Sequence, residues 1–395
     1  MSRYNYYKER LKDFSFPYAC LDREKFYQNV KQNLERAGSK NIRIASKSIR
    51  CRRVMEMIFD YHEQFQGIMA YHGNEVLFLA EKGFDDLLMA YPLVDQKILE
   101  KIAEWVGRGH QICLMVDGEE QIDRIEEAGK KYNVKVPVAL DIDMSDNYPG
   151  LRFGVWRSSI QNEKRLEQVV SHIKKMKHVI LEGIMGYEAQ IAGVGDAVSG
   201  GGVKNRLVKF LKKRSLPGVA ERRRQAVEYI EAEGFPLRIV NGGGTGSLES
   251  TRQEEVVTEV TVGSGFYNSH LFDYYQNFQL EPAMFYGIQI VRVPEEGIYT
   301  CHGGGFIASG GIEKVKAPVI YLPRGGHLDP MEGAGEVQTP VRFKNLEERL
   351  EIGDPVFLRH AKAGELCERF NEIILLGEKD YELMLTYRGE GMNFG

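Results

Sequence analysis

Lys47 and a glycine-rich loop much later in the chain are the parts of this sequence best suited to chemistry. Lys47 ends the apolar run Ile42 to Lys47, and the loop Asn241 to Gly246 follows the apolar run Leu237 to Val240. A lysine amine forms a Schiff base with an aldehyde, and glycine lets the backbone approach a phosphate closely. Together they predict a site for pyridoxal 5'-phosphate (PLP), bonded to Lys47 and held by its phosphate on the loop.

The backbone N–H groups of two glycine-rich turns are predicted to hold the phosphate. The residues are Gly243, Gly244, Thr245 and Gly246, with help from Gly263, Ser264 and Gly265. The N-terminus of a following helix would add a favourable dipole. A helix cap or a dinucleotide loop has a similar composition, but a dinucleotide loop stands early in its fold, whereas this loop comes late.

Eight short apolar runs alternate with amphipathic stretches of helical period. The predicted strands are Ile42 to Lys47, Gly67 to Ala70, Leu87 to Ala90, Ile112 to Val116, Val136 to Ile142, Val179 to Met185, Leu237 to Val240 and Val257 to Val262. Predicted helices between them include Leu99 to Val106, Gln121 to Tyr132 and Leu166 to Met176. This alternation predicts an α/β fold, a closed (β/α)8 TIM-like barrel, with an open doubly wound sheet as the alternative.

The residues that follow these strands are polar and rich in glycine, as expected where a barrel carries its active site. They are Lys47, Tyr71-His72, Tyr91-Pro92, Asp117, Asp143, Tyr187-Glu188, Asn241 to Gly246, and Gly263 to Gly265. We expect Tyr187 to stack on the cofactor or to aid proton transfer. His72 and Asp143 are expected to line the pocket.

After about Phe278 the pattern changes to short strands separated by Gly, Pro and Asp, which predicts a smaller all-β domain. The expected organisation is an arm over residues 1–16, a PLP-binding barrel over 17–278 and a β domain over 279–395. An aromatic-rich helix is expected over Phe266 to Phe278. The long connection Ile191 to Gly218 is expected to be a solvated crossover, or else a mobile lid or subunit contact.

Composition narrows the class of protein. The chain has 395 residues, 43% of them hydrophobic, and a net charge of -4, so neither a nucleic-acid partner nor a membrane partner is indicated. The N-terminus lacks an apolar signal core, and five scattered cysteines without a CxxC pair are typical of reduced thiols. These features predict a cytoplasmic enzyme with a small-molecule substrate.

The motifs taken in order resemble the fold-type III PLP enzymes, whose barrels are like the N-terminal domain of alanine racemase. The similarity is strongest to the D-threonine aldolase and D-serine dehydratase branch, which includes bacterial amino acid deaminase/aldolase proteins. The segments that carry it are Phe16 to Asp22, Arg43 to Lys47, Gly83 to Pro92, Gly186 to Glu188, Gly242 to Thr245 and Gly353 to His360.

This resemblance implies a lyase of D-amino acid metabolism that cleaves or dehydrates a β-hydroxy D-amino acid through the Lys47 Schiff base. It implies that Arg152 lies near the pyridine nitrogen, and that the enzyme is a homodimer. Two alternatives remain. An amino-acid racemase would need a second base, for which no tyrosine match is evident, and PLP carriers resemble the barrel alone.

The resemblance also implies a divalent metal beside the cofactor, bound by a His-x-Cys or His-x-Asp pair. Here the corresponding residues are His360-Ala361-Lys362, and a protonated lysine is a poor ligand, so the metal is left open. His360 is the candidate ligand. Lys362 could instead supply fixed positive charge, and both are predicted to act in catalysis. His327-x-Asp329 also has ligand spacing, but we interpret it as a loop.

Overall fold

The computed structural model describes residues 1–395 except 199, 312, 345, 347 and 363. Contacts divide the chain into two compact units. The first unit comprises Met1–Gln32, Ser48–Glu56 and Ser264–Asn393, and the second comprises Asn33–Lys47, Met57–Gly263 and Phe394–Gly395. Each unit therefore joins segments that are far apart in the sequence. No helix in the described part of the chain is both long and apolar enough to cross a membrane.

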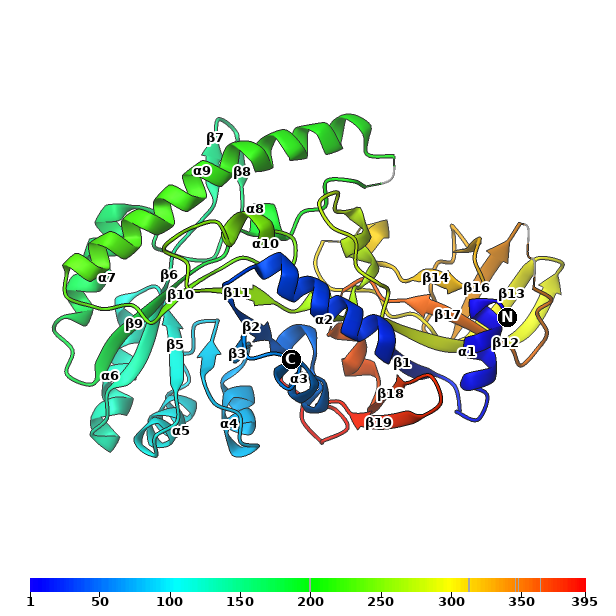
Figure 1. Ribbon diagram of the computed structural model, residues 1–395, viewed down its shortest axis with the longest axis horizontal. Coiled ribbons are helices and arrows are strands. Elements are labelled where there is room, and N and C mark those ends of the chain that lie inside the picture. Colours follow the sequence, from blue (N-terminus) through cyan, green and yellow to red (C-terminus); the bar gives the residue numbers. More distant parts are fainter. Residues whose placement is uncertain (199, 312, 345, 347, 363) are drawn as a thin grey trace. The chain divides into compact units, whose positions relative to one another are not determined.

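The second unit is built on a closed barrel of eight parallel strands (Figure 1). The strands are β2 (Asn41–Ala45), β3 (Phe65–Ala70), β4 (Leu87–Met89), β5 (Ile112–Val116), β6 (Val136–Asp141), β9 (Val179–Gly186), β10 (Ile239–Gly242) and β11 (Glu259–Val262). Their order is β10-β11-β2-β3-β4-β5-β6-β9, closed on itself. All eight predicted strands are present, which confirms the closed barrel over the open doubly wound sheet.

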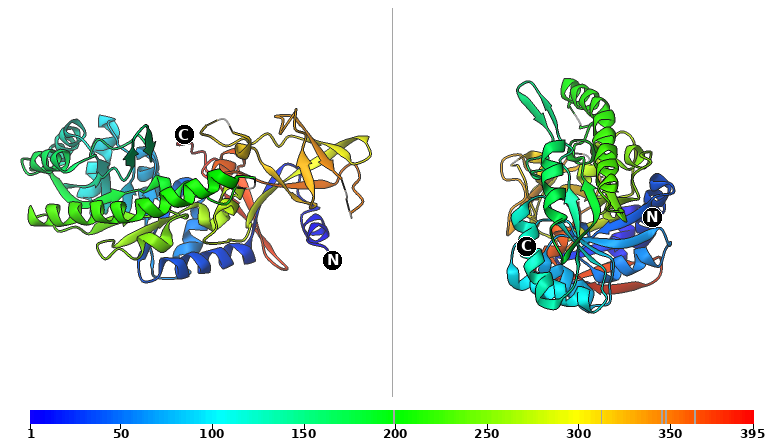
Figure 2. Two further views of the ribbon diagram at one scale, coloured as in Figure 1. Left: turned by 90° about the horizontal axis from the view of Figure 1, so that it is seen from above. Right: turned by 90° about the vertical axis from the view of Figure 1, so that its left-hand side faces the viewer.

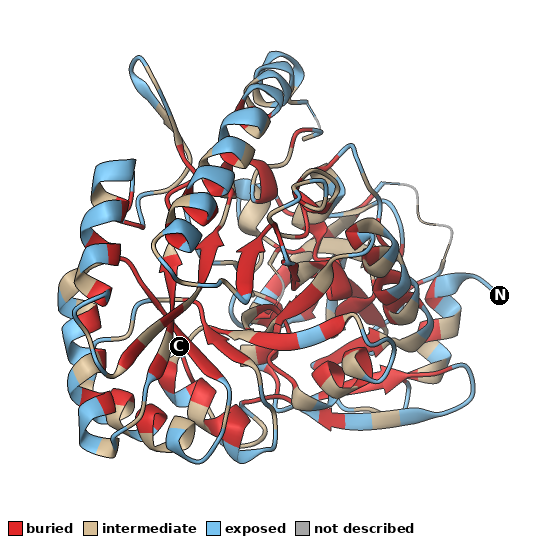
Figure 3. Ribbon diagram, turned by 60° about the vertical axis from the view of Figure 1, so that its left-hand side comes forward, coloured by how far each residue is buried: buried red, intermediate tan, exposed pale blue. Residues whose placement is uncertain are grey.

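Helices alternate with the barrel strands. They are α2 (Arg23–Ala37), η1 (Ser46–Ser48), α3 (Arg52–Phe59), α4 (Gly73–Glu81), α5 (Gln96–Gly107), α6 (Glu119–Tyr132), α7 (Glu163–Ile173), α8 (Ala189–Ala192), α9 (Gly202–Ala232) and α10 (Leu248–Thr251). In α5 the Asp95 side chain caps the N-terminus by accepting from the Lys97 and Ile98 amides. Figure 3 shows mainly buried strands inside helices whose outer faces are exposed.

Side chains inside the barrel form stacked layers because alternate residues of a strand point inward. One layer contains Leu88, Cys113, Ala139 and Ile239, all buried. The next layer contains Ala90, Met115 and Met185, with Met69 and Tyr91 packed against it. Asp141 pairs with Met185 at the level of this second layer, and one further step of two residues along β5 and β9 leads to Asp117 and Tyr187. The apolar interior therefore ends in a layer of polar side chains at the C-terminal ends of the strands.

The first unit contains a nine-stranded sheet. Its strands are β1 (Tyr18–Asp22), β12 (Met284–Glu295), β13 (Ile298–His302), β14 (Val319–Leu322), β15 (Gly326–Leu328), β16 (Gln338–Phe343), β17 (Pro355–Arg359), β18 (Glu372–Leu376) and β19 (Tyr381–Leu385). Short helices accompany them, namely α1 (Arg3–Arg10), α11 (Ser264–Tyr267), η2 (His270–Tyr274), η3 (Lys314–Lys316) and η4 (Glu365–Arg369). This agrees with the predicted all-β region after the barrel.

Strand β1 lies in this sheet, between β12 and β18. It pairs antiparallel with β12 and parallel with β18, so the N-terminal segment is bound to strands from the end of the chain. Residues 18–22 were included in the predicted barrel range 17–278, and here they contribute to the β region instead. The division into independent domains at residues 16 and 278 stays a prediction.

One local prediction needs revision, and one connection can be described further. The single helix expected over Phe266 to Phe278 is wrong, because α11 ends at Tyr267 and Asn268 adopts a left-handed conformation with φ of 51°. The connection Ile191 to Gly218 is largely helical, since α9 begins at Gly202 and continues to Ala232 (Figures 1 and 2). Residue 199 in this connection lies outside the described residues.

A buried ion pair joins the first and last strands of the barrel. Arg43 on β2 is 1% exposed and donates to Glu259 on β11, with Nε–Oε1 and Nη2–Oε2 distances of 2.6 and 2.9 Å. Its Nη2 also contacts Asp86 Oδ2 at 3.0 Å, and Asp86 in turn pairs with Arg238. These contacts satisfy the charges at the N-terminal end of the barrel.

We expect Arg43→Met to destabilise the barrel by about 3–5 kcal/mol, because it leaves the Glu259 carboxylate buried without its partner. Adding Glu259→Gln should restore part of this loss. Arg238→Met, at a side chain that is 42% exposed, should cost under about 1 kcal/mol. Urea unfolding of the three variants measures these differences, and equal losses for Arg43→Met and Arg238→Met would contradict the assignment.

Candidate active site

Lys47 lies at the mouth of the barrel, in the turn η1 that follows β2. Its Nζ donates to the Tyr91 hydroxyl at 2.7 Å and lies 5.3 Å from the centroid of that ring. Tyr91 packs against the inner layer formed by Ala90, Met115 and Met185. The amine is therefore held over the barrel interior, at the end predicted from the sequence.

Tyr187 follows β9 and faces the glycine-rich loop. A Cβ atom built on Gly244 would lie 3.2 Å from Cε2 of the Tyr187 ring, so glycine permits the close approach of ring and loop. The Arg157 guanidinium lies 5.9 Å from the ring centroid. Burial and the neighbouring Glu188 carboxylate raise the pKa of Tyr187 to about 12, although Arg157 opposes the shift. Tyr187 is thus a neutral phenol that can donate a hydrogen bond.

Two backbone N–H groups of the loop after β10 form hydrogen bonds with nearby side chains of the same unit. Gly243 adopts a φ of 79°, and its N–H donates to Glu188 Oε2 at 3.2 Å. The Gly244 N–H donates to Ser247 Oγ at 3.1 Å. Two of the N–H groups predicted to hold phosphate therefore already have partners. Helix α10 has only four residues, so it supplies little of the dipole expected at this point.

The other side of the mouth carries two carboxyl groups on adjacent strands. Asp117 follows β5 and accepts from the Ser159 amide at 2.5 Å and from Gln121 Nε2 at 2.8 Å. Asp141 ends β6, and its pKa is raised to about 7 by burial and by the negative charge of Asp117, while Arg157 opposes the shift. Asp141 can therefore exchange a proton near neutral pH.

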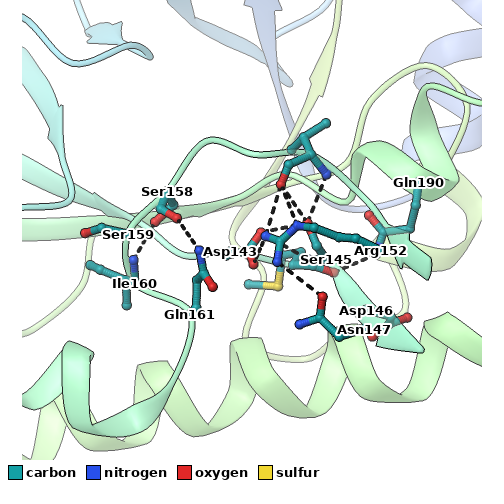
Figure 4. A network of polar contacts seen from close by, with 12 residues as sticks. Asp143, Ser145, Asp146, Asn147, Arg152, Ser158, Ser159, Ile160, Gln161 and Gln190 are labelled. Carbon is teal, nitrogen blue, oxygen red and sulfur yellow. Dashed lines mark hydrogen bonds and ion pairs between the residues drawn. The ribbon is translucent and has the colours of Figure 1, made fainter. Parts of the chain in front are cut away.

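Arg152 lies on the hairpin of β7 (Asp146–Tyr148) and β8 (Leu151–Phe153), and Figure 4 shows it in a polar network. Its Nη2 donates to Asp143 Oδ2 at 2.7 Å, and Nη1 donates to Asn147 Oδ1 at 3.3 Å. Its guanidinium also stacks on Trp156 at 4.0 Å. Asp143, expected to line the pocket, thus binds Arg152, and the placement of Arg152 at a pyridine nitrogen stays a prediction.

Four predicted site residues belong to the first unit. Ser264 contacts Ser48 through their hydroxyls at 3.4 Å, and Gly265 follows it in α11.

His360 follows β17 and is 3% exposed, and neither ring nitrogen has a hydrogen-bond partner among the described residues. Burial, together with Arg359 and His270, lowers the pKa of His360 to about 3. Lys362 Nζ donates to Ser309 Oγ at 2.8 Å and pairs with Glu365 at 3.0 Å.

Across the described ranges, no three His, Cys, Asp or Glu side chains come together as a set that could hold a metal ion. Asp329 accepts from the Met331 and Glu332 amides and from Arg342, which is the loop role predicted for His327-x-Asp329. His72 caps α4 by accepting from the Asn74 amide at 3.1 Å.

The sequence did not single out Tyr91, Arg157, Asp141 or Glu188 as site residues. Tyr91 and Glu188 were among the strand-end residues and lie in segments that carry the family resemblance, but no role was predicted for them. The strand pattern could have indicated Asp141. It stands two positions after the inward-facing Ala139 in the same strand, so its side chain also points into the barrel. Arg157 is exposed and lies beyond the β7–β8 hairpin, so only the folded chain brings it to Tyr187.

Comparisons with known proteins agree with this architecture. A family model described as alanine racemase, N-terminal domain, matches residues 21–270. The 3-hydroxy-D-aspartate aldolase of Paracoccus denitrificans (strain Pd 1222) is 20% identical over 199 residues, which make up 50% of this chain but only 46% of that relative. That match therefore spans under half of the relative's length.

Two solved structures share the fold over nearly the whole chain. D-threonine aldolase from Filomicrobium marinum is 17% identical with a TM-score of 0.80, covering 96% of each chain. D-threo-3-hydroxyaspartate dehydratase from Delftia sp. HT23 is 17% identical with a TM-score of 0.76, covering 95% of this chain and 98% of that one. At these identities the likeness establishes the fold.

The raised pKa of Asp141 has a consequence for stability. The unfolded chain releases this proton near the ordinary value of 3.8, whereas the folded chain keeps it to about 7. The stability that Asp141 contributes is therefore full below 3.8 and is lost as the pH rises to about 7. We expect Asp141→Asn to gain stability relative to the wild type over this range, as measured by urea midpoints of the cofactor-free protein.

The exposed Asp60 provides the control for this experiment. Asp60→Asn should follow the wild-type profile at every pH. If Asp141→Asn also runs parallel to the wild type, the Asp141 carboxyl titrates as it does in water and has no special role at the mouth.

Proposed function

Because this chain belongs to the alanine racemase N-terminal domain family, we propose that it is a PLP-dependent lyase acting on a β-hydroxy D-amino acid. The observation that carries the proposal is the Lys47 amine, which donates to Tyr91 at the mouth of the barrel. The glycine-rich loop follows strand β10 of the same closed barrel. The relatives named aldolase and dehydratase indicate cleavage or dehydration of a 3-hydroxy amino acid.

The residues of the barrel mouth fit the cofactor. Lys47 offers the amine, and the loop from Gly243 to Gly246 offers a backbone without bulky side chains. When bound, PLP supplies an electron sink for the bond that breaks at the substrate Cα. Tyr187, kept neutral by its raised pKa, is suited to lie against the cofactor and donate a hydrogen bond.

Proton transfer is assigned to groups of the chain. The Lys47 Nζ and the Tyr91 hydroxyl are joined by a hydrogen bond, so a proton can pass between them at the barrel mouth. Asp141 has a pKa of about 7 and can accept or return a proton on the opposite side of the barrel. A racemase would use two such groups on opposite faces of the substrate, so racemisation is the alternative outcome of the assay below.

Further features of the proposal come from the sequence. His360 and Lys362 are proposed to help the substrate hydroxyl leave or lose its proton, and Arg152, Gly263, Ser264 and Gly265 to assist cofactor binding. The enzyme is further proposed to be a cytoplasmic homodimer. No step here is assigned to a metal ion, and treatment with a chelator, described below, tests whether one acts.

We expect purified protein incubated with PLP to absorb in the visible region, and borohydride to fix the cofactor to the Lys47 peptide. Lys47→Ala should abolish both signals and the activity, because no other amine ends a barrel strand at the mouth. Lys40, whose Nζ donates to Val257 O at 2.6 Å, provides the matched control. Lys40→Ala should label as the wild type does. Labelling of a different lysine would overturn the proposal.

The reaction type is decided by the products. D- and L-serine, threonine, allo-threonine and 3-hydroxyaspartate are incubated with the PLP-loaded protein and assayed for glycine with aldehyde, for oxo-acid with ammonia, and for the epimer. A lyase yields one of the first two pairs from the D-substrates. Epimer alone would make the protein a racemase.

Lys362 is predicted to supply positive charge that would otherwise require a metal. Activity should then survive chelator treatment, while Lys362→Ala should lose a factor of about 10²–10³ in turnover and still bind PLP. The exposed Lys344 is the control, and Lys344→Ala should remain active. Loss of activity in chelator, restored by manganese or zinc, would show that a metal acts. If Lys362→Ala is fully active, the prediction is wrong, and Lys362 only binds Ser309 and Glu365.

A further inference from the structure

Glu188 is a fully buried carboxylate that binds the glycine-rich loop from a neighbouring strand. It follows β9 and is 1% exposed. Its Oε1 accepts from Ser247 Oγ at 2.7 Å and from Thr251 Oγ1 at 2.5 Å. Its Oε2 accepts from the Gly243 amide at 3.2 Å and from Arg223 Nη2 at 2.9 Å. Three of these four donors belong to the loop and to α10, so a single carboxylate binds the loop at three points.

Arg223 allows this charge to be buried. It comes from α9, is 0% exposed, and donates to Gly186 O at 2.7 Å as well as to Glu188 and Glu254. A Cβ atom on Gly242 would lie 2.9 Å from Arg223 Cζ, so the glycine at the end of β10 is needed for this approach. The Glu188 charge is thereby neutralised locally and does not repel an anion at the loop.

The same contacts orient the remaining N–H groups of the loop. Gly243 donates to Glu188 and Gly244 donates to Ser247, whereas the Gly246 N–H has no hydrogen-bond partner within the described residues. Arg36 donates to the Thr245 carbonyl at 2.6 Å and restrains the tip of the loop from the opposite side. The loop is thus curled around internal bonds, which leave the Gly246 N–H for an external acceptor.

We propose that Glu188 is a positioning residue, which holds the loop from Gly243 to Ser247 in the conformation that receives a phosphate monoester. The inference rests on the proposed function, because PLP is the phosphate ester concerned. Glu188 does not touch the phosphate itself. It acts through the Gly243 amide and the Ser247 and Thr251 hydroxyls.

Pyridoxal, which lacks the phosphate, separates a positioning role from a general structural one. Both aldehydes react with Lys47, and only PLP uses the loop. In Glu188→Gln, one oxygen is replaced by an amide and the charge facing Arg223 is lost. We expect the PLP dissociation constant to rise about tenfold or more, as for a lost charge-assisted hydrogen bond, and that of pyridoxal to change less than about twofold. Titration of the visible absorbance measures both constants.

Glu182 provides the matched control, because it lies on β9, the strand that Glu188 follows, and pairs with the partly exposed Arg238. Glu182→Gln should leave both dissociation constants unchanged. If circular dichroism shows that Glu188→Gln does not fold, Thr251→Val decides the question. It removes one of the four donors to Glu188 and should weaken PLP binding severalfold without affecting pyridoxal.

The outcomes separate this inference from the proposed function. If the wild type binds both aldehydes and the variants weaken both equally, or neither, Glu188 has no positioning role and the proposed function stands. If the wild type attaches neither aldehyde to Lys47, the proposed function fails and this inference fails with it.

Discussion

Closure of the barrel between β2 and β11 is the constraint on which the rest of the site depends. The parallel pairing of Ile44 with Val262 places the first barrel strand beside the last. Lys47 follows one of these strands, and the glycine-rich loop follows β10, the next strand in the ring. Two segments that are far apart in the chain thus come to the same edge. The buried Arg43–Glu259 pair stabilises this closure at the other end of the barrel.

The polar groups at one end of the barrel stabilise the fold, whereas those at the other end can exchange protons. At the N-terminal end, Arg43, Glu259 and Asp86 satisfy one another in a closed network. At the C-terminal end, Asp141 has a raised pKa and Tyr187 is kept neutral, and both lie at the same end of the barrel as Lys47. The first arrangement supports stability, whereas the second leaves groups that can exchange protons. Between them lie apolar layers that keep water out of the interior.

Helix α9 contributes the buried Arg223 side chain that binds the glycine-rich loop's carboxylate partner, Glu188. The long connection after β9 was expected to be a crossover, a lid or a subunit contact, yet Arg223 from this helix is fully buried against Glu188 and Glu254. An arginine in a basic surface helix gives no sign in the sequence that it is buried, because the neighbouring residues have the same charge. Its partners stand in two other segments, and only packing brings the three together.

The sequence by itself determined the barrel, the lysine at the end of its first strand and the glycine-rich loop. The reason is that apolar runs of strand length and helical periods are local patterns, and strand ends in a closed parallel barrel must share one edge. The tertiary structure decided which partner each polar group has. Arg152 binds Asp143, Glu188 binds the loop, and Asp141 owes its pKa to burial beside Asp117. Such pairings depend on distances between segments that no local pattern records.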